Sequence, residues 1–161
     1  MGARRSAGLL PFRVRDAQLE VLIAHMGGPF WARRDEGAWS IFKGEHSDSE
    51  DAYAAARREF TEETGAPAPD GEALALGEVR QAGGKRVTVW AIESEFEAKQ
   101  IKSNTFALEW PRGSEKMAEF PEMDRAGWFD CATARRKLVK GQVAFVDRLE
   151  SAVDAARARR A

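Results

Sequence analysis

The sequence predicts a mixed α/β or α+β fold, in which helices and a β-sheet pack in layers. Strand-like apolar segments outnumber helical ones, and the clearest helical segment lies between pairs of strands. The 161 residues are 43% hydrophobic and 32% charged, the composition of an ordinary globular protein with a buried core. No internal repeat or low-complexity linker interrupts them, so we expect residues 1–161 to form a single domain.

Two strands are predicted at the start of the chain, where two apolar segments are separated by a short polar turn. The second contains the consecutive apolar residues Val21, Leu22 and Ile23, which is typical of a central strand buried on both faces. A loop with Gly and Pro follows, and a short apolar strand then leads to Gly44. The strands are expected at residues 7–15, 19–25 and 39–42, and the loop at 26–38.

A helix is predicted after Gly44. Ser47 and Glu50 have the spacing of a capping box, and the helix is therefore expected to begin close to them. Phe60 belongs to its apolar stripe, and the Pro- and Gly-containing segment 66–71 ends it. The candidate N-cap residues are Ser47, Asp48 and Ser49.

The second half of the chain is expected to contain four strands, a charged loop and two helices. Alternation of apolar and polar residues indicates the strands, and apolar residues at helical spacing indicate the last helix. The strands are expected at 73–81, 85–95, 106–110 and 126–129, the charged loop at 112–125, and the helices at 131–140 and 142–158.

Three carboxylates in the helix after Gly44 carry the chemical argument. Glu59, Glu62 and Glu63 stand at i, i+3 and i+4, so they share one helix face within a single turn. Like charges at this spacing repel one another, and a hard divalent cation with oxygen ligands would offset the repulsion. Arg58 and Glu50 are placed to form an ion pair at the junction between the loop and the helix.

This segment resembles the Nudix box and matches its fixed positions. The matching residues are Gly44, Glu50, Arg58, Glu59, Phe60, Glu62, Glu63, Gly65 and Ala66. The segments WSIFKG and EFPEMDRAGWF are similar to the bacterial branch of predicted NTP pyrophosphohydrolases. The resemblance implies the Nudix fold, an α/β/α sandwich with a mixed β-sheet. It also implies hydrolysis of a pyrophosphate bond in a nucleoside diphosphate linked to another moiety, of the NTP, dNTP or dinucleoside polyphosphate class, with Mg²⁺ or Mn²⁺ as cofactor.

The resemblance also assigns roles to individual residues. It makes Glu59 and Glu63 the principal metal ligands, with Glu62 as a further ligand, direct or through water. The backbone carbonyl of Lys43 is another expected ligand. Glu50 and Arg58, with Gly44 and Gly65, are expected to be structural residues of the box. The general base stays open between Glu59 and an acid outside the box.

Further acids and cations are candidates on the basis of their positions. The resemblance implies a further acid from a loop late in the fold, and Glu122 is favoured for it, then Glu119, over Glu115, although acidic loops are commonly only solvated. Candidates for substrate binding are Lys43, Lys85, Trp31 and Arg34. Phe30 and Trp39 are further aromatic candidates for stacking on a base, and His25 for contacting phosphate, although such residues are more often structural.

One residue departs from the branch pattern. Phe42 stands where that branch has proline, which would fix the backbone angle φ just before Lys43. We therefore expect the carbonyl of Lys43 to be held less rigidly. This difference does not by itself imply loss of activity.

Composition excludes several other classes of function. A net charge of −1 gives no overall attraction to nucleic acid or to an anionic membrane, and the Nudix resemblance implies a small-molecule nucleotide as the partner. The single cysteine, Cys131, fits a reducing cytoplasm, and no apolar run reaches the length of a membrane span. The alternatives are a non-catalytic nucleotide sensor and a diphosphate isomerase, and the oligomeric state, monomer or homodimer, is left open.

Overall fold

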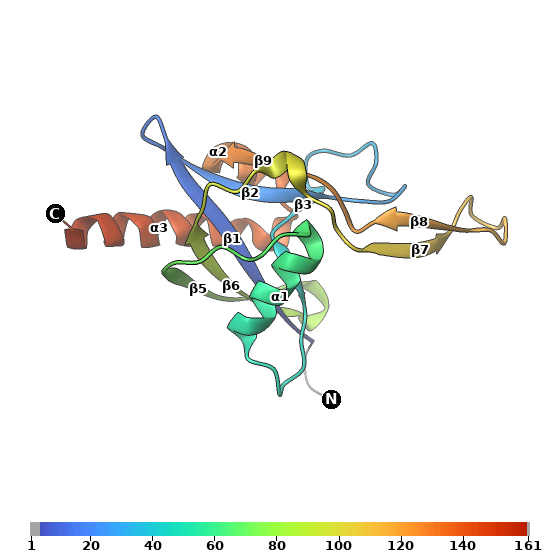
Figure 1. The fold of residues 1–161 in the computed structure, drawn as a ribbon, viewed down its shortest axis with the longest axis horizontal. Helices are drawn as coiled ribbons and strands as arrows, with labels where there is room; N and C mark the ends of the chain where they lie inside the picture. Colours follow the sequence, from blue (N-terminus) through green and yellow to red (C-terminus); the bar gives the residue numbers. More distant parts are fainter. Residues whose placement is uncertain (1–3, 161) are drawn as a thin grey trace.

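The computed structural model describes residues 4–160, and a mixed seven-stranded sheet forms its centre (Figure 1). Strand β1 pairs in parallel with β6, whereas the other pairings are antiparallel. The order is β3-β2-β1-β6-β5, with β4 also paired to β1 and β9 to β2. The strands are β1 (Arg5–Arg15), β2 (Gln18–Met26), β3 (Trp39–Ser40), β4 (Phe42–Glu45), β5 (Ala73–Arg80), β6 (Arg86–Glu93) and β9 (Met123–Asp130).

A two-stranded hairpin and several helices complete the described chain. The hairpin pairs β7 with β8 and projects from the body of the molecule (Figure 1). Its strands are β7 (Thr105–Glu109) and β8 (Met117–Pro121), and the α-helices are α1 (Ala52–Thr64), α2 (Cys131–Lys137) and α3 (Val143–Arg160). Short 3₁₀ turns are found at η1 (Ala82–Gly84), η2 (Ala98–Gln100) and η3 (Lys140–Gln142).

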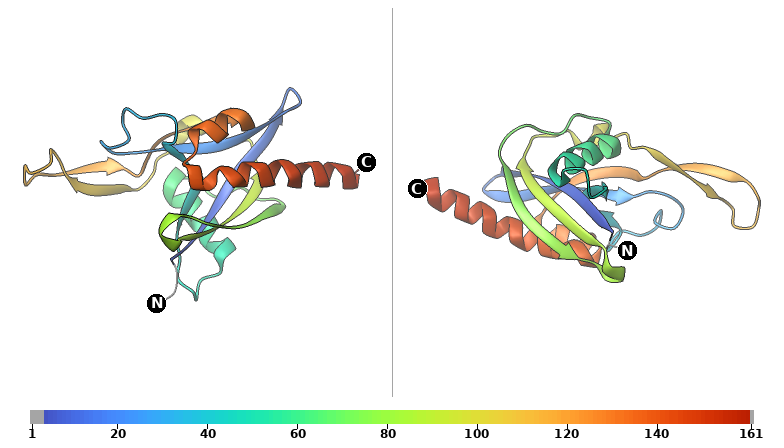
Figure 2. Two further views of the ribbon diagram at one scale, coloured as in Figure 1. Left: turned by 180° about the vertical axis from the view of Figure 1, so that it is seen from behind. Right: turned by 90° about the horizontal axis from the view of Figure 1, so that it is seen from below.

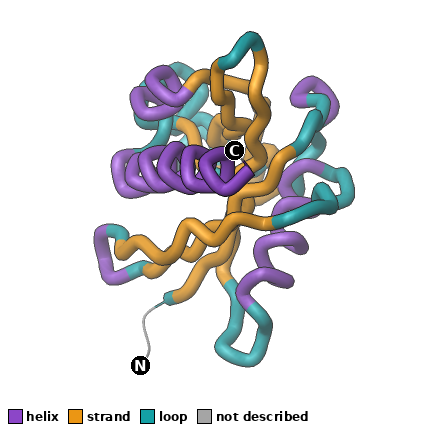
Figure 3. Tube along the Cα trace, turned by 90° about the vertical axis from the view of Figure 1, so that its left-hand side faces the viewer, coloured by secondary structure: helices purple, strands orange, loops and turns teal. Residues whose placement is uncertain are grey.

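Helices cover both faces of the large sheet, with α1 on one face and α2 and α3 on the other (Figures 2 and 3). Successive residues of a strand point to opposite faces, so β1 contributes to both hydrophobic cores. Leu9 packs in the core under α1, whereas Leu10 packs in the core under α3. This arrangement confirms the expected α/β sandwich with a mixed sheet.

The central strand β2 behaves as its sequence predicts. Val21, Leu22 and Ile23 are all fully buried, and β2 pairs with β9 along one edge and with β1 and then β3 along the other. The short strand predicted at 39–42 divides at Ile41. Its backbone N–H donates to the side chain of Gln142, which takes the place of a neighbouring strand at that point.

The prediction of a charged loop at 112–125 is wrong. Residues 117–121 form β8, and β9 begins at Met123 instead of Ala126. Both strands are held by partners distant in sequence, since β8 pairs with β7 and Met123 pairs with Met26 on β2. The polar composition of this segment reflects strands with an exposed face, and charge alone did not distinguish them from a loop.

The predicted start of the box helix is also wrong. Helix α1 begins at Ala52, and the carboxylate of Asp51 caps it by accepting a hydrogen bond from the backbone N–H of Ala54 at 3.0 Å. Ser47 and Glu50 do not form a capping box. Their backbones form a turn, and the Glu50 side chain binds Arg58 instead.

Candidate active site

The buried carboxylate of Glu63 ties helix α1 to strand β4. Glu63 is only 4% exposed, and its Oε1 accepts a hydrogen bond from the backbone N–H of Lys43 at 2.9 Å. Burial raises the pKa of Glu63 to about 8, although this hydrogen bond and the Lys43 ammonium act in the opposite direction. The carboxyl group is therefore placed where a nearby cation would strongly favour its charged form.

Gly44 allows Glu59 to lie against β4. A Cβ atom at Gly44 would lie 2.0 Å from the Glu59 carboxylate, far inside van der Waals contact. Gly65 serves the other end of α1, because it adopts the left-handed conformation with φ of 77° and donates its N–H to the carbonyl of Thr61. Both glycines are thus required by geometry at the positions where the Nudix resemblance places them.

Arg58 binds three carboxylates of the box. Its guanidinium forms the expected ion pair with Glu50 through two hydrogen bonds of 3.0 Å. It also donates to Glu59 at 2.8 Å and to Glu62 at 3.1 Å, two contacts that the sequence did not predict. The pKa of Glu50 is lowered by this hydrogen bond, so the pair is charged at neutral pH.

The backbone brings Glu122 to the carboxylates of α1. Its N–H donates to the carbonyl of Asn104, and the N–H of Asn104 donates in turn to the carbonyl of Glu62 near the C-terminal end of the helix. Burial raises the pKa of Glu122, and the charge of Glu62 raises it further. The pKa of Glu59 is likewise raised, first by burial and then by Glu62, with a smaller effect of Glu122.

Asn104 is the positioning residue that sequence reasoning missed. It links helix α1 to Glu122 through backbone hydrogen bonds, so its side chain gives no signal in the sequence. The other two late acids lie along the hairpin. Glu119 is on the exposed face of β8, and Glu115 lies in the turn between β7 and β8.

The candidate substrate-binding residues fall into two separate pairs. The first pair is Lys43 and Lys85: the pKa of Lys43 is lowered first by burial and then by the positive charge of Lys85. Trp31 and Arg34 form the second pair in the loop after β2, with the guanidinium 5.6 Å from the ring centre. Trp31 packs partly buried against the core on the α3 face, away from the α1 face.

Two further candidates from the sequence lie inside the fold. His25 is fully buried, with Nδ1 2.9 Å from a carboxylate oxygen of Asp124 and Nε2 2.7 Å from the carbonyl oxygen of Arg34. Trp39 is 3% exposed and packs edge-to-face against His25. Their contacts join β2, β3, β9 and the loop at 27–37, a structural role.

Phe42 is also part of the core. Its ring is fully buried and packs edge-to-face on Phe60, with 5.2 Å between ring centres. Its backbone pairs with Leu9 in the ladder between β1 and β4. A Cβ atom at the adjacent Gly8 would lie 2.6 Å from the Phe42 carbonyl oxygen, so the two strands approach closely here. The ladder thus holds the backbone that leads to Lys43.

The acidic residues around α1 and β4 fit a hard divalent cation. Three of the four carboxyl groups have a raised pKa, partly because their neighbours are also acidic, and oxygen donors of this kind are what Mg²⁺ and Mn²⁺ prefer. Within residues 4–160, no three Asp, Glu, His or Cys side chains already stand at the spacing of a metal cage. Arg58 instead draws the carboxylates of Glu59 and Glu62 toward its guanidinium. The four residues are Glu59, Glu62, Glu63 and Glu122.

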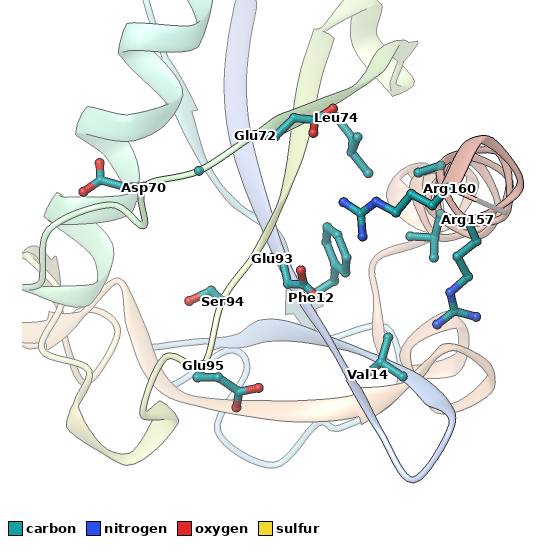
Figure 4. Close-up of a pocket in the computed structure, with 13 residues that line it drawn as sticks. Phe12, Val14, Asp70, Glu72, Leu74, Glu93, Ser94, Glu95, Arg157 and Arg160 are labelled. Atoms are coloured by element: carbon teal, nitrogen blue, oxygen red, sulfur yellow. The ribbon is translucent and has the colours of Figure 1, made fainter.

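A separate cavity of about 600 Å³ lies on the opposite side of the sheet (Figure 4). Apolar side chains such as Phe12 and Leu74 line it together with carboxylates from β6 and the segment before β5. Arg157 and Arg160 reach it from the end of α3. It shares no lining residue with the acidic site on the α1 face.

The chain belongs to the Nudix hydrolase superfamily, since the family model of the NUDIX domain matches its sequence over residues 3–149. The fold is that of solved Nudix proteins. The NUDIX domain of Shewanella oneidensis NrtR, in complex with ADP ribose, superposes with a TM-score of 0.65 at 16% identity, covering 94% of this chain and 88% of that one. None of the helices within residues 4–160 combines the length and the apolar character of a membrane span.

Two other solved structures share the fold with comparable TM-scores. A Caenorhabditis elegans Ap4A hydrolase superposes with a TM-score of 0.62 at 17% identity, covering 95% of this chain and 99% of that one. The Escherichia coli ORF135 protein gives 0.57 at 20% identity, with coverage of 99% and 94%. Among curated proteins, no sequence matches the chain.

Proposed function

We propose that this Nudix hydrolase cleaves a pyrophosphate bond in a nucleoside diphosphate linked to another moiety, by attack of water at phosphorus, with Mg²⁺ or Mn²⁺ as cofactor. The observation that carries the proposal is the gathering of Glu59, Glu62, Glu63 and Glu122 at the junction of β4, α1 and the start of β9. Membership in the superfamily supports hydrolysis of nucleotide pyrophosphates in general.

The acidic residues would hold the metal. Glu59 and Glu63 are the principal ligands in this proposal, with Glu62 and the backbone carbonyl of Lys43 as further ones. The bound metal supplies neutralisation of phosphate charge and acidification of water. The chain's own contribution is to hold Glu63 buried against β4 and to keep Glu59 beside Gly44.

The remaining residues orient the site and bind substrate. Lys43 and Lys85 would bind substrate, since positive charge there favours phosphate binding. Arg58 and Glu50 orient the box through their paired hydrogen bonds. Either Glu59 or Glu122 is the general base, since both have a raised pKa that suits proton transfer closer to neutral pH.

The nature of the substrate is supported by two of the similar structures. One is described as a complex with ADP ribose and the other as an Ap4A hydrolase, and both ligands contain a nucleoside joined through phosphates to a second group. Both similarities favour a small-molecule nucleotide for this chain. We further propose that residues 1–161 act as one domain in the cytoplasm, as a monomer or homodimer.

A diphosphate isomerase using a catalytic cysteine gains no support from Cys131. This thiol is buried, and burial raises its pKa to about 11, so it stays protonated at neutral pH. It packs in the core under α2 and α3, not on the α1 face.

The test is a substrate panel of nucleoside triphosphates, dinucleoside polyphosphates and nucleotide sugars, with chromatographic separation of the nucleotide products as the readout. Each is incubated with Mg²⁺, with Mn²⁺ and with a chelator, for the wild type and for Glu63→Gln. We expect metal-dependent turnover that falls at least 100-fold in the variant, the scale on which loss of one strong electrostatic contact acts. Tight nucleotide binding without any turnover would instead favour a non-catalytic sensor.

A further inference from the structure

A fully buried histidine near the end of β2 faces hydrogen-bond acceptors on both sides of its ring. Nδ1 of His25 lies 2.9 Å from a carboxylate oxygen of Asp124, and Nε2 lies 2.7 Å from the carbonyl oxygen of Arg34. Removal of either partner would leave a polar atom of the ring unsatisfied inside the protein, which is costly. The ring therefore holds Asp124 in a fixed place relative to β2.

Asp124 is the extra residue of a β-bulge in β9. In the ladder between β2 and β9, His25 pairs with Arg125, whereas the next residue of β2, Met26, pairs with Met123. One residue of β9 is thus left over between the two pairs, and that residue is Asp124. A bulge bends its strand and redirects the side chains next to it. The contact with His25 holds the strand at this bend.

The bulge decides which face of the sheet the start of β9 presents. Ala126 and Trp128 pack toward the core under α1, and strict alternation from them would place Met123 on the opposite face. Met123 is instead buried in the core under α1, because the extra residue shifts the alternation by one. The chain therefore enters β9 directly beneath the box helix, with Glu122 as the residue just before Met123.

The end of β2 also contacts the segment that carries Glu122. The backbone N–H of Gly27 donates to the carbonyl of Glu122 at 2.8 Å. A Cβ atom at Gly27 would lie 1.9 Å from the carbonyl oxygen of Pro121, so the two backbones touch at this point. His25, two residues earlier on β2, holds the same segment at a second point, through the bulge.

We propose that His25 and Asp124 are positioning residues for the hydrolysis, because their contact fixes the bulge that places Glu122 at the acidic site. The proposal rests on the proposed function and extends its site through the sheet, since the ring of His25 packs against Trp39 in the core under α2 and α3. His25 touches neither substrate nor metal in this proposal, and it acts through Asp124 and the backbone of β9. Loss of such a supporting contact commonly lowers activity by about 10–100-fold.

Asp35 supplies a matched control in the same region. Its carboxylate accepts hydrogen bonds from the indole N–H of Trp39 at 2.8 Å and from the ammonium of Lys137 at 2.7 Å. It thus secures the loop at 27–37, whose Arg34 carbonyl faces His25, but it lies outside β9 and its bulge. Asp35→Ala therefore loosens the same region and leaves the contact between His25 and Asp124 in place.

The test varies Asp124, because its side chain is 28% exposed and can be truncated without opening a cavity at the buried ring. On any substrate of the panel that is turned over, kcat and KM are measured for the wild type, Asp124→Ala, Asp124→Asn and Asp35→Ala. We expect Asp124→Ala to lower kcat about tenfold and to leave KM within twofold. Asp124→Asn should recover part of kcat, since its amide oxygen still accepts from the ring, and Asp35→Ala should stay within twofold.

The same variants are combined with Glu122→Gln. If Asp124 acts through Glu122, then Asp124→Ala should change kcat by less than twofold in this background, because two residues that share one effect are not additive. An equal loss in both backgrounds would overturn the proposal, since it would mean a general effect on the fold. So would an unchanged kcat in Asp124→Ala, an equal loss in Asp35→Ala, or no recovery in Asp124→Asn.

Amide hydrogen exchange tests the positioning without turnover. If the wild type hydrolyses nothing on the panel, the proposed function fails, but the N–H groups of Gly27 and Glu122 still report how firmly this segment is held, since they bond to Glu122 and Asn104. Asp124→Ala should speed the exchange of both about tenfold, the scale of one lost hydrogen bond to a charged group, and Asp35→Ala should not. Unchanged exchange at both amides in Asp124→Ala would overturn the positioning role.

Discussion

The box around α1 differs from the arm, formed by the β7–β8 hairpin and the loop at 27–37, in how its residues are held. In the box, Arg58 binds Glu50 with two hydrogen bonds, and Glu63 is buried against the backbone of Lys43. In the arm, β7 and β8 form a sheet of their own, and large rings such as Phe30 remain half exposed. An isolated two-stranded hairpin is marginally stable in water, so the arm depends on its anchors to the body.

The tightly held residues of the box are suited to chemistry at the reacting atoms. The box fixes charged groups relative to one another over a short stretch of sequence, as metal-assisted phosphate chemistry requires. Changes in the box should therefore lower kcat for every substrate.

The largest effect is expected for Gly44→Ala. The added Cβ atom would lie 2.0 Å from the Glu59 carboxylate, so Glu59 must leave its position. Misplacement of a catalytic group by about 1 Å costs on the order of 100-fold in rate, and we expect kcat to fall by about this factor for all substrates. Steady-state kinetics measures the change.

Gly37→Ala is the matched control for this substitution. A Cβ atom added at Gly37 would meet no atom within 4 Å. The positive φ of Gly37, 73°, makes alanine mildly strained there. It should lower stability slightly and leave kcat within about twofold, since surface changes rarely disturb a distant site. A Gly44→Ala enzyme with normal kcat would show that the position of Glu59 does not matter for turnover.

Much of the fold could be predicted because its signals are local. The consecutive apolar residues Val21, Leu22 and Ile23 indicated a central strand, and the burial of all three confirms it. Strand β8 was missed because it depends on pairing with β7, and its alternating exposed residues resemble a charged loop. Long-range pairing leaves little trace in a short polar segment.

The same distinction applies to the site. The spacing of Glu59, Glu62 and Glu63 predicted a shared helix face, and the ion pair of Glu50 with Arg58 followed from their places in the box. The link through Asn104 uses only backbone atoms, so no side-chain pattern could have indicated it. The roles of these residues in catalysis stay predictions, which the panel with Glu63→Gln tests.

A smaller effect is expected on the pH dependence of stability in the absence of metal. Burial raises the pKa of Glu63 to about 8, whereas the unfolded chain loses this proton near pH 4.5. Between these values the folded state binds more protons, so the free energy of unfolding falls as the pH rises. Glu63→Gln removes this titration, and its melting temperature should fall less than that of the wild type between pH 5 and about 8.

Thermal melts in chelator at several pH values measure this difference. Each kcal/mol shifts the melting temperature of a domain of this size by about 2–4 °C, so the separation of the two curves is resolvable. Addition of Mg²⁺ at pH 8 should raise the melting temperature of the wild type more than that of the variant. Parallel curves for the two proteins would mean that Glu63 ionises in the folded state as it does in the unfolded chain.

The smallest effect concerns the start of the box helix. Asp51 accepts a hydrogen bond from the N–H of Ala54, so Asp51→Ala leaves this donor to water and should lower the free energy of unfolding by about 1 kcal/mol. Ser47→Ala should change it by less than about 0.5 kcal/mol, because the Ser47 hydroxyl contacts only Ser49 among the described residues. Urea denaturation measures both. If Ser47→Ala proved the more damaging, the helix would begin where the sequence alone placed it, and the carboxylates of the box would be anchored from a different first turn.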